Sequence, residues 1–167
     1  MVGLIALAAP QAALAADPDD GSDGAEASSS SVTCGGDPSP TALALSATED
    51  ACAGYSLGAC RTVEAWRKRT SSVGVLLWKY WQRIYFCWQS NKITYLFRSR
   101  GGTVYTFCCW DYQGHIGNST SWNAKWSYRA FTEGKLYWYG PPWPMTKTPE
   151  IWMTVYGNGS WTWATSN

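Results

Sequence analysis

The chain has 167 residues, with thirteen Lys and Arg against twelve Asp and Glu, and this near-neutral balance hides two segments of opposite charge. No basic residue precedes Arg61, and eight of the twelve acids lie at or before Asp50, so residues 1–60 carry a net charge of −8. Residues 61–167, with thirteen cations against four acids, carry +9 and hold all twelve tryptophans. No repeat of fixed period occurs, which argues against a propeller or solenoid.

Residues 1–16 are predicted to be a signal peptide. Val2–Ala16 is a short run rich in Ala and Leu, and an acidic, turn-forming stretch follows it directly. Small residues before that stretch match a signal-peptidase site, with cleavage after Ala15 or Ala16. A run of about 15 residues is too short for a membrane anchor, and no later stretch is apolar enough to be an integral membrane segment. We therefore expect a secreted, extracellular protein.

Residues 17–40 are poor in large apolar side chains and rich in Asp, Ser, Gly and Pro. Such a composition buries too little surface to offset chain entropy, so we expect a disordered acidic linker or a propeptide. Residues 41–60 contain cysteines and are expected to pack on the body that follows. A short helix is predicted over residues 41–53.

Six cysteines behind a signal sequence indicate a disulfide framework whose pairing the sequence leaves open. Cys87 and the adjacent Cys108 and Cys109 are predicted to lie two strands apart, too far for a bridge between them. We therefore expect the N-terminal cysteines to pair into the body, and the two adjacent cysteines to have different partners. The spacings do not match zinc-ligand motifs, and no metal or other cofactor is predicted. The six are Cys34, Cys52, Cys60, Cys87, Cys108 and Cys109.

Residues 61–167 are predicted to form an aromatic-rich, basic, all-β domain. Period-two alternation over Val75–Trp88 indicates a strand, and residues 61–69 indicate an additional one. One face of the first strand is apolar except for Gln82, and it consists of Leu76, Trp78, Tyr80, Ile84, Phe86 and Trp88. Turn residues separate the predicted strands that follow, with Gly101-Gly102 as a hairpin turn and residues 113–123 as a loop. The predicted strands are Ile93–Ser99, Thr103–Tyr112, Trp126–Phe131 and Lys135–Tyr139.

The last hairpin has the clearest pattern in the chain, with strands over Ile151–Gly157 and Ser160–Thr165 around Asn158-Gly159. Before it, the proline-rich segment Gly140–Pro144 is predicted to be an exposed loop that presents Trp143. Seven or eight short strands in about 100 residues are typical of a small antiparallel β-sandwich or a small barrel. The disulfides would staple this fold.

A two-residue loop at Asn158-Gly159 would set Tyr156 opposite Trp161 and Thr154 opposite Trp163. An aromatic face would result, formed by Trp152, Tyr156, Trp161 and Trp163. The opposite, aliphatic face would supply the core, with Ile151, Met153 and Val155 beside Thr162 and Ala164. Such a row either closes the sandwich or stays exposed as a platform on which sugar rings stack. We also considered Trp143, Tyr139 and Arg98 as ligand-binding residues, and Arg67, Lys68 and Arg69 as a patch for polyanions.

Titratable groups are scarce in the basic segment, which has one histidine, His115, and four carboxylates. We therefore expect a non-catalytic protein that binds a polysaccharide or an anionic cell-surface polymer, and no nucleic acid. One alternative is a secreted, bacteriocin-like toxin that acts on competing cells or membranes. A second is a protease inhibitor or another protein-binding module that uses the proline-rich loop. The carboxylates are Glu64, Asp111, Glu133 and Glu150.

Overall fold

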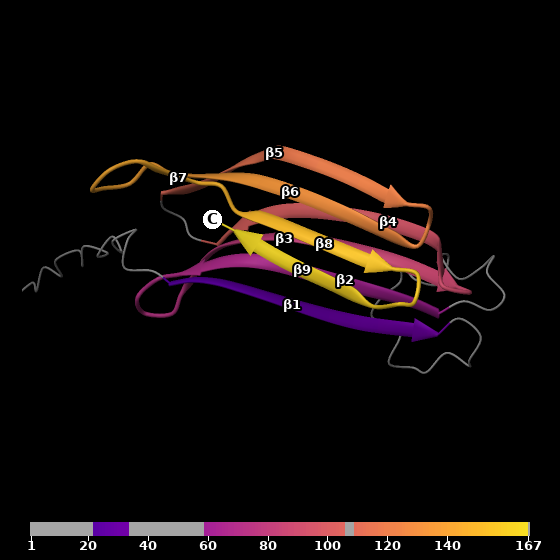
Figure 1. Cartoon of the computed structure of the whole chain (residues 1–167). Coiled ribbons are helices and arrows are strands. Elements are labelled where there is room, and N and C mark those ends of the chain that lie inside the picture. The colour runs from indigo at the N-terminus through magenta and orange to yellow at the C-terminus, as the bar shows by residue number, and fades with distance from the viewer. Residues whose placement is uncertain (1–21, 34–58, 106–108, 167) are drawn as a thin grey trace, which may run out of the picture.

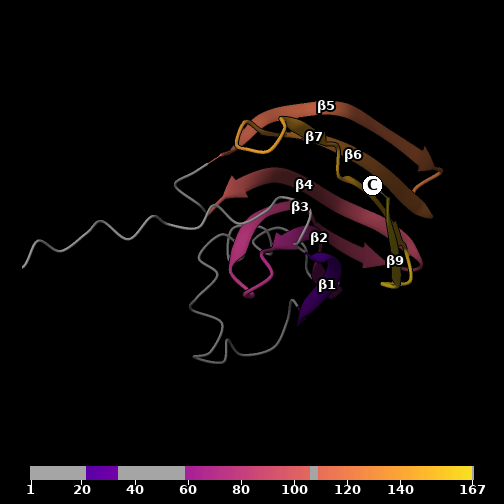
Figure 2. The ribbon, with the colours of Figure 1, turned by 90° about the vertical axis from the view of Figure 1, so that its left-hand side faces the viewer.

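The computed structural model describes residues 22–33, 59–105 and 109–166, which form an all-β domain with no helix in these ranges. Nine strands lie in two antiparallel sheets that stack as two layers (Figures 1 and 2). The strands are β1 (Ser22–Thr33), β2 (Ala59–Thr70), β3 (Leu76–Gln89), β4 (Lys92–Val104), β5 (Trp110–Asn123), β6 (Ser127–Trp138), β7 (Met145–Lys147), β8 (Glu150–Tyr156) and β9 (Trp161–Ser166).

One sheet has four strands in the order β1-β2-β3-β4, and the other has five, with β5-β6-β8-β9 in line and β7 paired to β6. The predicted β-sandwich is therefore confirmed, as are the additional strand at residues 61–69 and the strand over Val75–Trp88. The predicted helix over residues 41–53 and the predicted signal peptide lie outside the described residues.

The core lies between the two sheets and follows the predicted alternation. On β3, Trp78, Tyr80, Ile84 and Phe86 are fully or almost fully buried, and Gln82 is buried on the same face. From the other sheet, β8 contributes the predicted aliphatic face, on which every side chain is fully buried. Those side chains are Ile151, Met153 and Val155.

Residues 22–33 form edge strand β1, so the prediction of a disordered segment over 17–40 is wrong for these residues. The strand has few apolar side chains, and its charges match those of β2. Asp23 pairs with Arg69 at 2.9 Å, and Glu26 pairs with Lys68. β1 has little apolar surface to bury, and its ion pairs with the basic strand β2 contribute to holding it in the sheet.

Two predicted turns lie inside strands, because their glycines make room for aromatic rings. β4 continues through Gly101-Gly102, and β6 continues through Gly134, which joins two predicted strands into one. A Cβ atom on Gly102 would lie 2.5 Å from the ring of Tyr112, and one on Gly134 would lie 2.5 Å from the ring of Tyr80. Glycine inside a strand often marks such a close approach.

These two contacts are reciprocal. Tyr80 reaches from β3 onto the β6 backbone, and Tyr112 reaches from β5 onto the β4 backbone, with the two ring centroids 6.1 Å apart. β5 also includes residues 113–123, which were predicted to be a loop. Its Ser, Thr and Asn side chains suit an edge strand because most of them face solvent.

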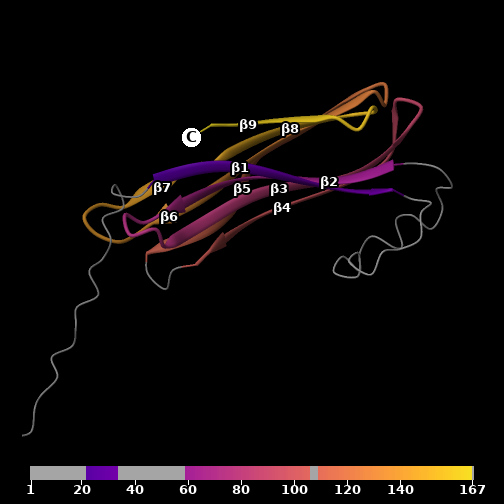
Figure 3. The same cartoon turned by 90° about the horizontal axis from the view of Figure 1, so that it is seen from below.

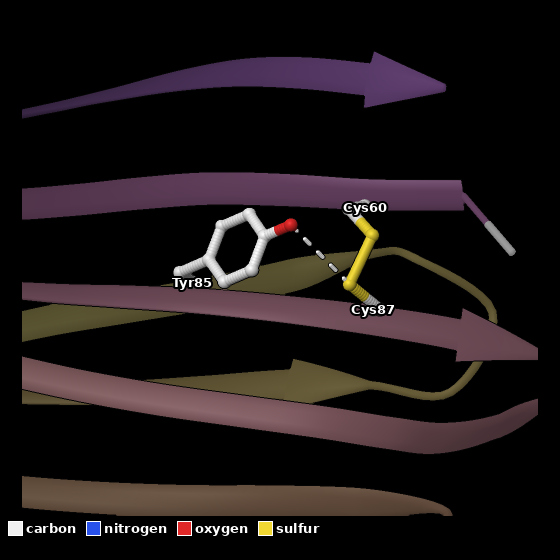
Figure 4. Close-up of a disulfide and its surroundings, with 3 residues drawn as sticks. All are labelled: Cys60, Tyr85 and Cys87. Atoms are coloured by element: carbon white, nitrogen blue, oxygen red, sulfur yellow. Dashed lines mark hydrogen bonds between the residues drawn. A yellow bond between two sulfur atoms is a disulfide. The ribbon is translucent and has the colours of Figure 1, made fainter. Parts of the chain in front are cut away.

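A disulfide joins Cys60 to Cys87 across β2 and β3 (Figure 4), with the two Cα atoms 4.0 Å apart. The bridge is fully buried, and the Tyr85 hydroxyl donates a hydrogen bond of 3.5 Å to the sulfur of Cys87. The prediction that an N-terminal cysteine pairs into the body is confirmed for Cys60. Cys109 is also disulfide-bonded. Cys34, Cys52 and Cys108 lie outside the described residues.

Candidate functional site

The register of the last hairpin differs by one residue from the predicted one. The loop contains three residues, Gly157 to Gly159, because the Tyr156 N–H donates to the Ser160 carbonyl at 3.0 Å. The Gly159 N–H in turn donates to the Tyr156 carbonyl at 2.9 Å, and Gly159 has a φ of 83°. Three-residue loops of this kind end in a left-handed residue, for which glycine is suited.

A slip of one residue exchanges the two faces of a strand. Trp161 therefore lies opposite Val155 and Trp163 opposite Met153, on the side of the core. The prediction that Trp152, Tyr156, Trp161 and Trp163 share one face is wrong. Trp152 and Tyr156 stay on the outer face of the five-stranded sheet, and Trp161 packs against the core. The register places Thr162 and Ala164 on the outer face.

The outer face of the five-stranded sheet has a shallow depression of about 320 Å³ next to Trp152. The half-buried indole of Trp152 packs against Phe131 of β6, with ring centroids 4.9 Å apart. Trp163 starts from the core side of the sheet by its register, but β9 is an edge strand and the 38% exposed side chain of Trp163 also lines the depression. The residues that line it are Arg129, Trp152, Thr154, Thr162, Trp163 and Ala164.

Polar groups of both signs lie along this face. Arg129 is exposed and forms no ion pair within the described part of the chain. On the other side of Trp152 along the strands, Glu133 of β6 lies opposite Glu150 of β8, and Ser166 donates a hydrogen bond to Glu150. An indole with hydroxyl, guanidinium and carboxylate groups nearby can contact both the C–H and the O–H groups of a sugar.

Tyr139 and Trp143 lie away from the depression. They follow the end of β6, and Tyr139 is eight residues beyond Phe131, which corresponds to about 26 Å along a strand. The loop is exposed as predicted, with Trp143 at 76% and Tyr139 at 59%. The structure therefore does not bring these two residues together with Trp152.

Arg67, Lys68 and Arg69 do not form the exposed basic patch that was considered. Alternation along β2 turns Arg67 and Arg69 inward, where they are 8% and 4% exposed. Arg67 donates a hydrogen bond to Thr165 of β9 at 3.3 Å. Lys68 faces outward but is paired with Glu26, as Arg69 is with Asp23. Two of these cations are in ion pairs and two are buried, so little positive charge is accessible to a polyanion.

Arg98 is placed between the two sheets and not on an aromatic face. Its guanidinium donates to the side-chain oxygen of Gln82 at 2.5 Å, to the carbonyl of Phe131 at 2.8 Å and to the side-chain oxygen of Asn118 at 2.7 Å. Burial lowers the pKa of Arg98. These bonds connect β4 and β3 of one sheet to β5 and β6 of the other. Arg98 therefore links the two sheets, and we call this set of hydrogen bonds the inter-sheet tie.

We expect Arg98→Lys to lower the free energy of unfolding by about 2 kcal/mol, because one ammonium cannot reach three acceptors and leaves Gln82 or Phe131 unsatisfied. Urea unfolding followed by fluorescence measures the change. The matched control is Arg129→Lys at an exposed position, which should stay within about 0.5 kcal/mol of the native protein. Equal stability of the two variants would contradict the role of Arg98 as a tie.

His115 lies next to this tie in a hydrogen-bonded group with two tyrosines. Its Nδ1 is 2.9 Å from the Tyr80 hydroxyl, which also lies 2.6 Å from the hydroxyl of Thr132. Burial, followed by the charges of Arg100 and Arg98, lowers the pKa of His115, and burial raises the pKa of Tyr80 to about 12. Both groups are therefore neutral near pH 7, and their hydrogen bonds stabilise the contact between the sheets.

Two of the four carboxylates of the basic segment, Asp111 and Glu133, lie too far apart to form a catalytic pair. Asp111 lies opposite Tyr137 on β6, four residues from Glu133 and thus about 13 Å along the strand. A glycosidase needs its two carboxylates within about 5–10 Å. The sequence reasoning missed Arg129, Phe131, Thr154 and Thr162. An unbroken alternation from Ser127 to Trp138 would have placed Arg129 and Phe131 on the outer face.

Comparison with protein-family models, with curated proteins and with solved structures finds no match for this chain. Within the described ranges, no helix has the length and hydropathy required to cross a membrane.

Proposed function

We propose that this protein is a secreted, non-catalytic module that binds a polysaccharide on the outer face of its five-stranded sheet. The observation that supports the proposal is the depression beside Trp152, which is lined by an indole, two threonines and an arginine that forms no ion pair with any residue the structure describes. Concave sites with an aromatic surface and a few placed polar groups are typical of ligand binding.

The chemistry of a pyranose fits this arrangement. One face of the ring carries axial C–H groups that pack on an indole, and its edge carries hydroxyls that need hydrogen-bond partners. Thr154 and Thr162 can donate and accept, and Arg129 can donate to a ring oxygen, a hydroxyl or a uronic carboxylate. The site lies on regular strands, which hold side chains in fixed positions and so lower the entropy cost of binding.

Export is part of the proposal and rests on two observations. The first is the signal-peptide pattern of residues 1–16. The second is the buried disulfide between Cys60 and Cys87, since structural disulfides persist in oxidising compartments outside the cytosol. Polysaccharides of cell surfaces and walls are accessible to a protein in that location.

The test is binding to immobilised neutral and uronic-acid polysaccharides, measured with the native protein and two variants. We expect Trp152→Ala to weaken binding up to about tenfold, because a stacking contact with an aromatic ring contributes about 0.5–1.5 kcal/mol. Ala164→Arg fills the depression from an exposed position without removing a core contact, and it should weaken binding to a similar extent. Trp143→Ala, far from the depression, is the matched control and should bind as the native protein does.

Three outcomes would overturn the proposal. The native protein could bind none of the polysaccharides at low salt, or the two depression variants could bind as well as the control. Release of reducing ends from a bound polysaccharide would contradict the non-catalytic part of the proposal.

A further inference from the structure

Two edge strands, β4 of the four-stranded sheet and β5 of the five-stranded sheet, lie over one another along one side of the sandwich (Figure 2). In Figure 3, β4 runs along the side opposite to β9, so this side is separate from the depression beside Trp152. Alternation turns Arg98, Arg100 and Gly102 of β4 towards the other sheet. There Arg98 forms the inter-sheet tie, and the ring of Tyr112 of β5 covers Gly102.

Arg100 has a hydrogen-bond donor that the described chain leaves unused. Its Nη1 atom is buried and has no hydrogen-bond partner among residues 22–33, 59–105 and 109–166. The guanidinium of Arg98, two residues away, donates to three acceptors instead. A buried guanidinium nitrogen without a partner costs free energy, and an acceptor placed against it removes that cost. The inner face of β4 therefore holds a cation that is suited to an added acceptor.

No acid balances the two arginines of β4 within the part of the chain that the structure describes. Neither Arg98 nor Arg100 forms an ion pair there. The acids of β5 and β6, Asp111 and Glu133, lie on the outer face of their sheet, because the residues on both sides of each one point inward. The other acids in the described ranges are engaged by cations or by Ser166, and they are Asp23, Glu26, Glu64 and Glu150.

Tyr112 and His115 of β5 add polar groups next to these cations. The Tyr112 hydroxyl lies 3.3 Å from Nδ1 of His115, which in turn lies 2.9 Å from the Tyr80 hydroxyl of β3. Burial lowers the pKa of His115, and the charge of Arg100 lowers it further. Burial raises the pKa of Tyr112, and the charge of Arg100 opposes that rise. Arg100 thus acts on both groups, and the exposed side chain of His115 can be reached from solvent.

We propose that Arg100, Tyr112 and His115 form a binding site for an oxyanion, a sulfate, phosphate or carboxylate group, at the edge of the sandwich between β4 and β5. A guanidinium forms its strongest hydrogen bonds with charged oxygen atoms. A phenol O–H and an imidazole N–H can donate to the other oxygen atoms of the same group. Regular strands hold these donors in place, which lowers the entropy cost of binding. The site lies apart from the depression beside Trp152 and does not depend on the binding of a polysaccharide.

His115 provides the test, because it is the only histidine of the chain and its ring protons can be followed by NMR without assignment of other residues. Sodium sulfate is titrated into the native protein at constant ionic strength, with sodium chloride as the replaced salt. We expect a saturable change of the His115 signal. We also expect sulfate to raise the pKa of His115 by about 1, because a nearby anion favours the protonated ring. The affinity for sulfate should accordingly fall about tenfold as the pH rises and the ring loses its proton.

Two variants test the donors. Arg100→Gln should weaken sulfate binding about tenfold, because it removes the charge-assisted hydrogen bonds. Tyr112→Phe keeps the ring over Gly102 and removes only the hydroxyl, so it should weaken binding about threefold. It also keeps the test decisive if Arg100→Gln does not fold. The matched control is Arg83→Gln, which removes the same charge from an exposed position on the outer face of the same sheet and should bind sulfate as the native protein does.

Titrations with phosphate and with glucuronate distinguish the sources of the oxyanion. A saturable change with glucuronate would identify the carboxylate of an acidic sugar as a ligand, and a change with sulfate and phosphate alone would identify an inorganic or ester oxyanion. The inference is wrong if no oxyanion changes the His115 signal beyond chloride, if the pKa of His115 does not rise, or if Arg83→Gln loses as much binding as Arg100→Gln. Trp152→Ala should keep sulfate binding, and Arg100→Gln should keep binding to neutral polysaccharides, so the two proposals can fail separately.

Discussion

Gly134→Ala should destabilise the protein by about 3 kcal/mol, although it adds only one methyl group. The new Cβ atom would lie 2.5 Å from the ring of Tyr80, which is fully buried and has no free space to move into. A shift of that ring would also disturb the hydrogen bonds of its hydroxyl with Thr132 and His115. The loss should appear as a lower midpoint of chemical unfolding.

The matched control is Gly24→Ala on β1, where the nearest atom to a new Cβ is the flexible end of Lys68 at 3.3 Å. That variant should stay within about 0.5 kcal/mol of the native protein. A second variant, Gly134→Ala/Tyr80→Leu, should recover part of the loss, since the clash is with the ring. If Gly134→Ala is as stable as the control, then Gly134 lies in a turn as first predicted, and the reciprocal tyrosine contacts are wrong.

The second large effect concerns the buried bridge between β2 and β3. We expect the double variant Cys60→Ala/Cys87→Ala to lose about 3.5 kcal/mol, because the bridge closes a segment with a sequence separation of 27 residues and restricts the unfolded chain. Replacing both cysteines avoids a free thiol in the apolar cluster with Tyr85 and Tyr95. Chemical unfolding without reductant isolates this bridge from the one that involves Cys109.

A peptide map of the non-reduced protein provides the control for connectivity, since it must contain Cys60 and Cys87 in one linked fragment. A loss below about 1 kcal/mol in the double variant would show that the sheet register, and not the bridge, holds β2 against β3. The folded fraction of that variant should bind polysaccharide as the native protein does, because the depression beside Trp152 does not contain the bridge.

The proposed binding surface arises from the topology of the fold. The depression beside Trp152 depends on the order of strands in the five-stranded sheet, which brings Arg129 of β6 next to residues of β8 and β9.

Alternation along single strands was enough to predict the fold class and much of the core. The pattern over Val75–Trp88 predicted which side of β3 is buried, and the aliphatic face of β8 was predicted residue by residue. Both results are local, because a period of two assigns side chains to faces without knowledge of the partner strand. The exposure of Trp143 was also predictable, since its three neighbouring prolines cannot take part in a central strand.

Partners distant in the sequence decided the rest. In the sequence, Gly102 and Gly134 look like turn residues. In the structure they lie within strands, where the ring of Tyr112 packs on Gly102 and the ring of Tyr80 packs on Gly134. Likewise, β1 has the composition of a disordered segment, and it pairs along its length with β2, whose cations form two ion pairs with it.

The sequence by itself determined an all-β protein, the alternation of its core strands and the excess of aromatic residues in its basic part. The tertiary structure decided which aromatic residues share a surface, because one extra residue in the loop before β9 turned Trp161 onto the core and away from Trp152. Side-chain direction in a strand repeats every two residues, so the register set by a loop controls the composition of a whole face. A site that spans several strands therefore depends on pairings that no single segment encodes.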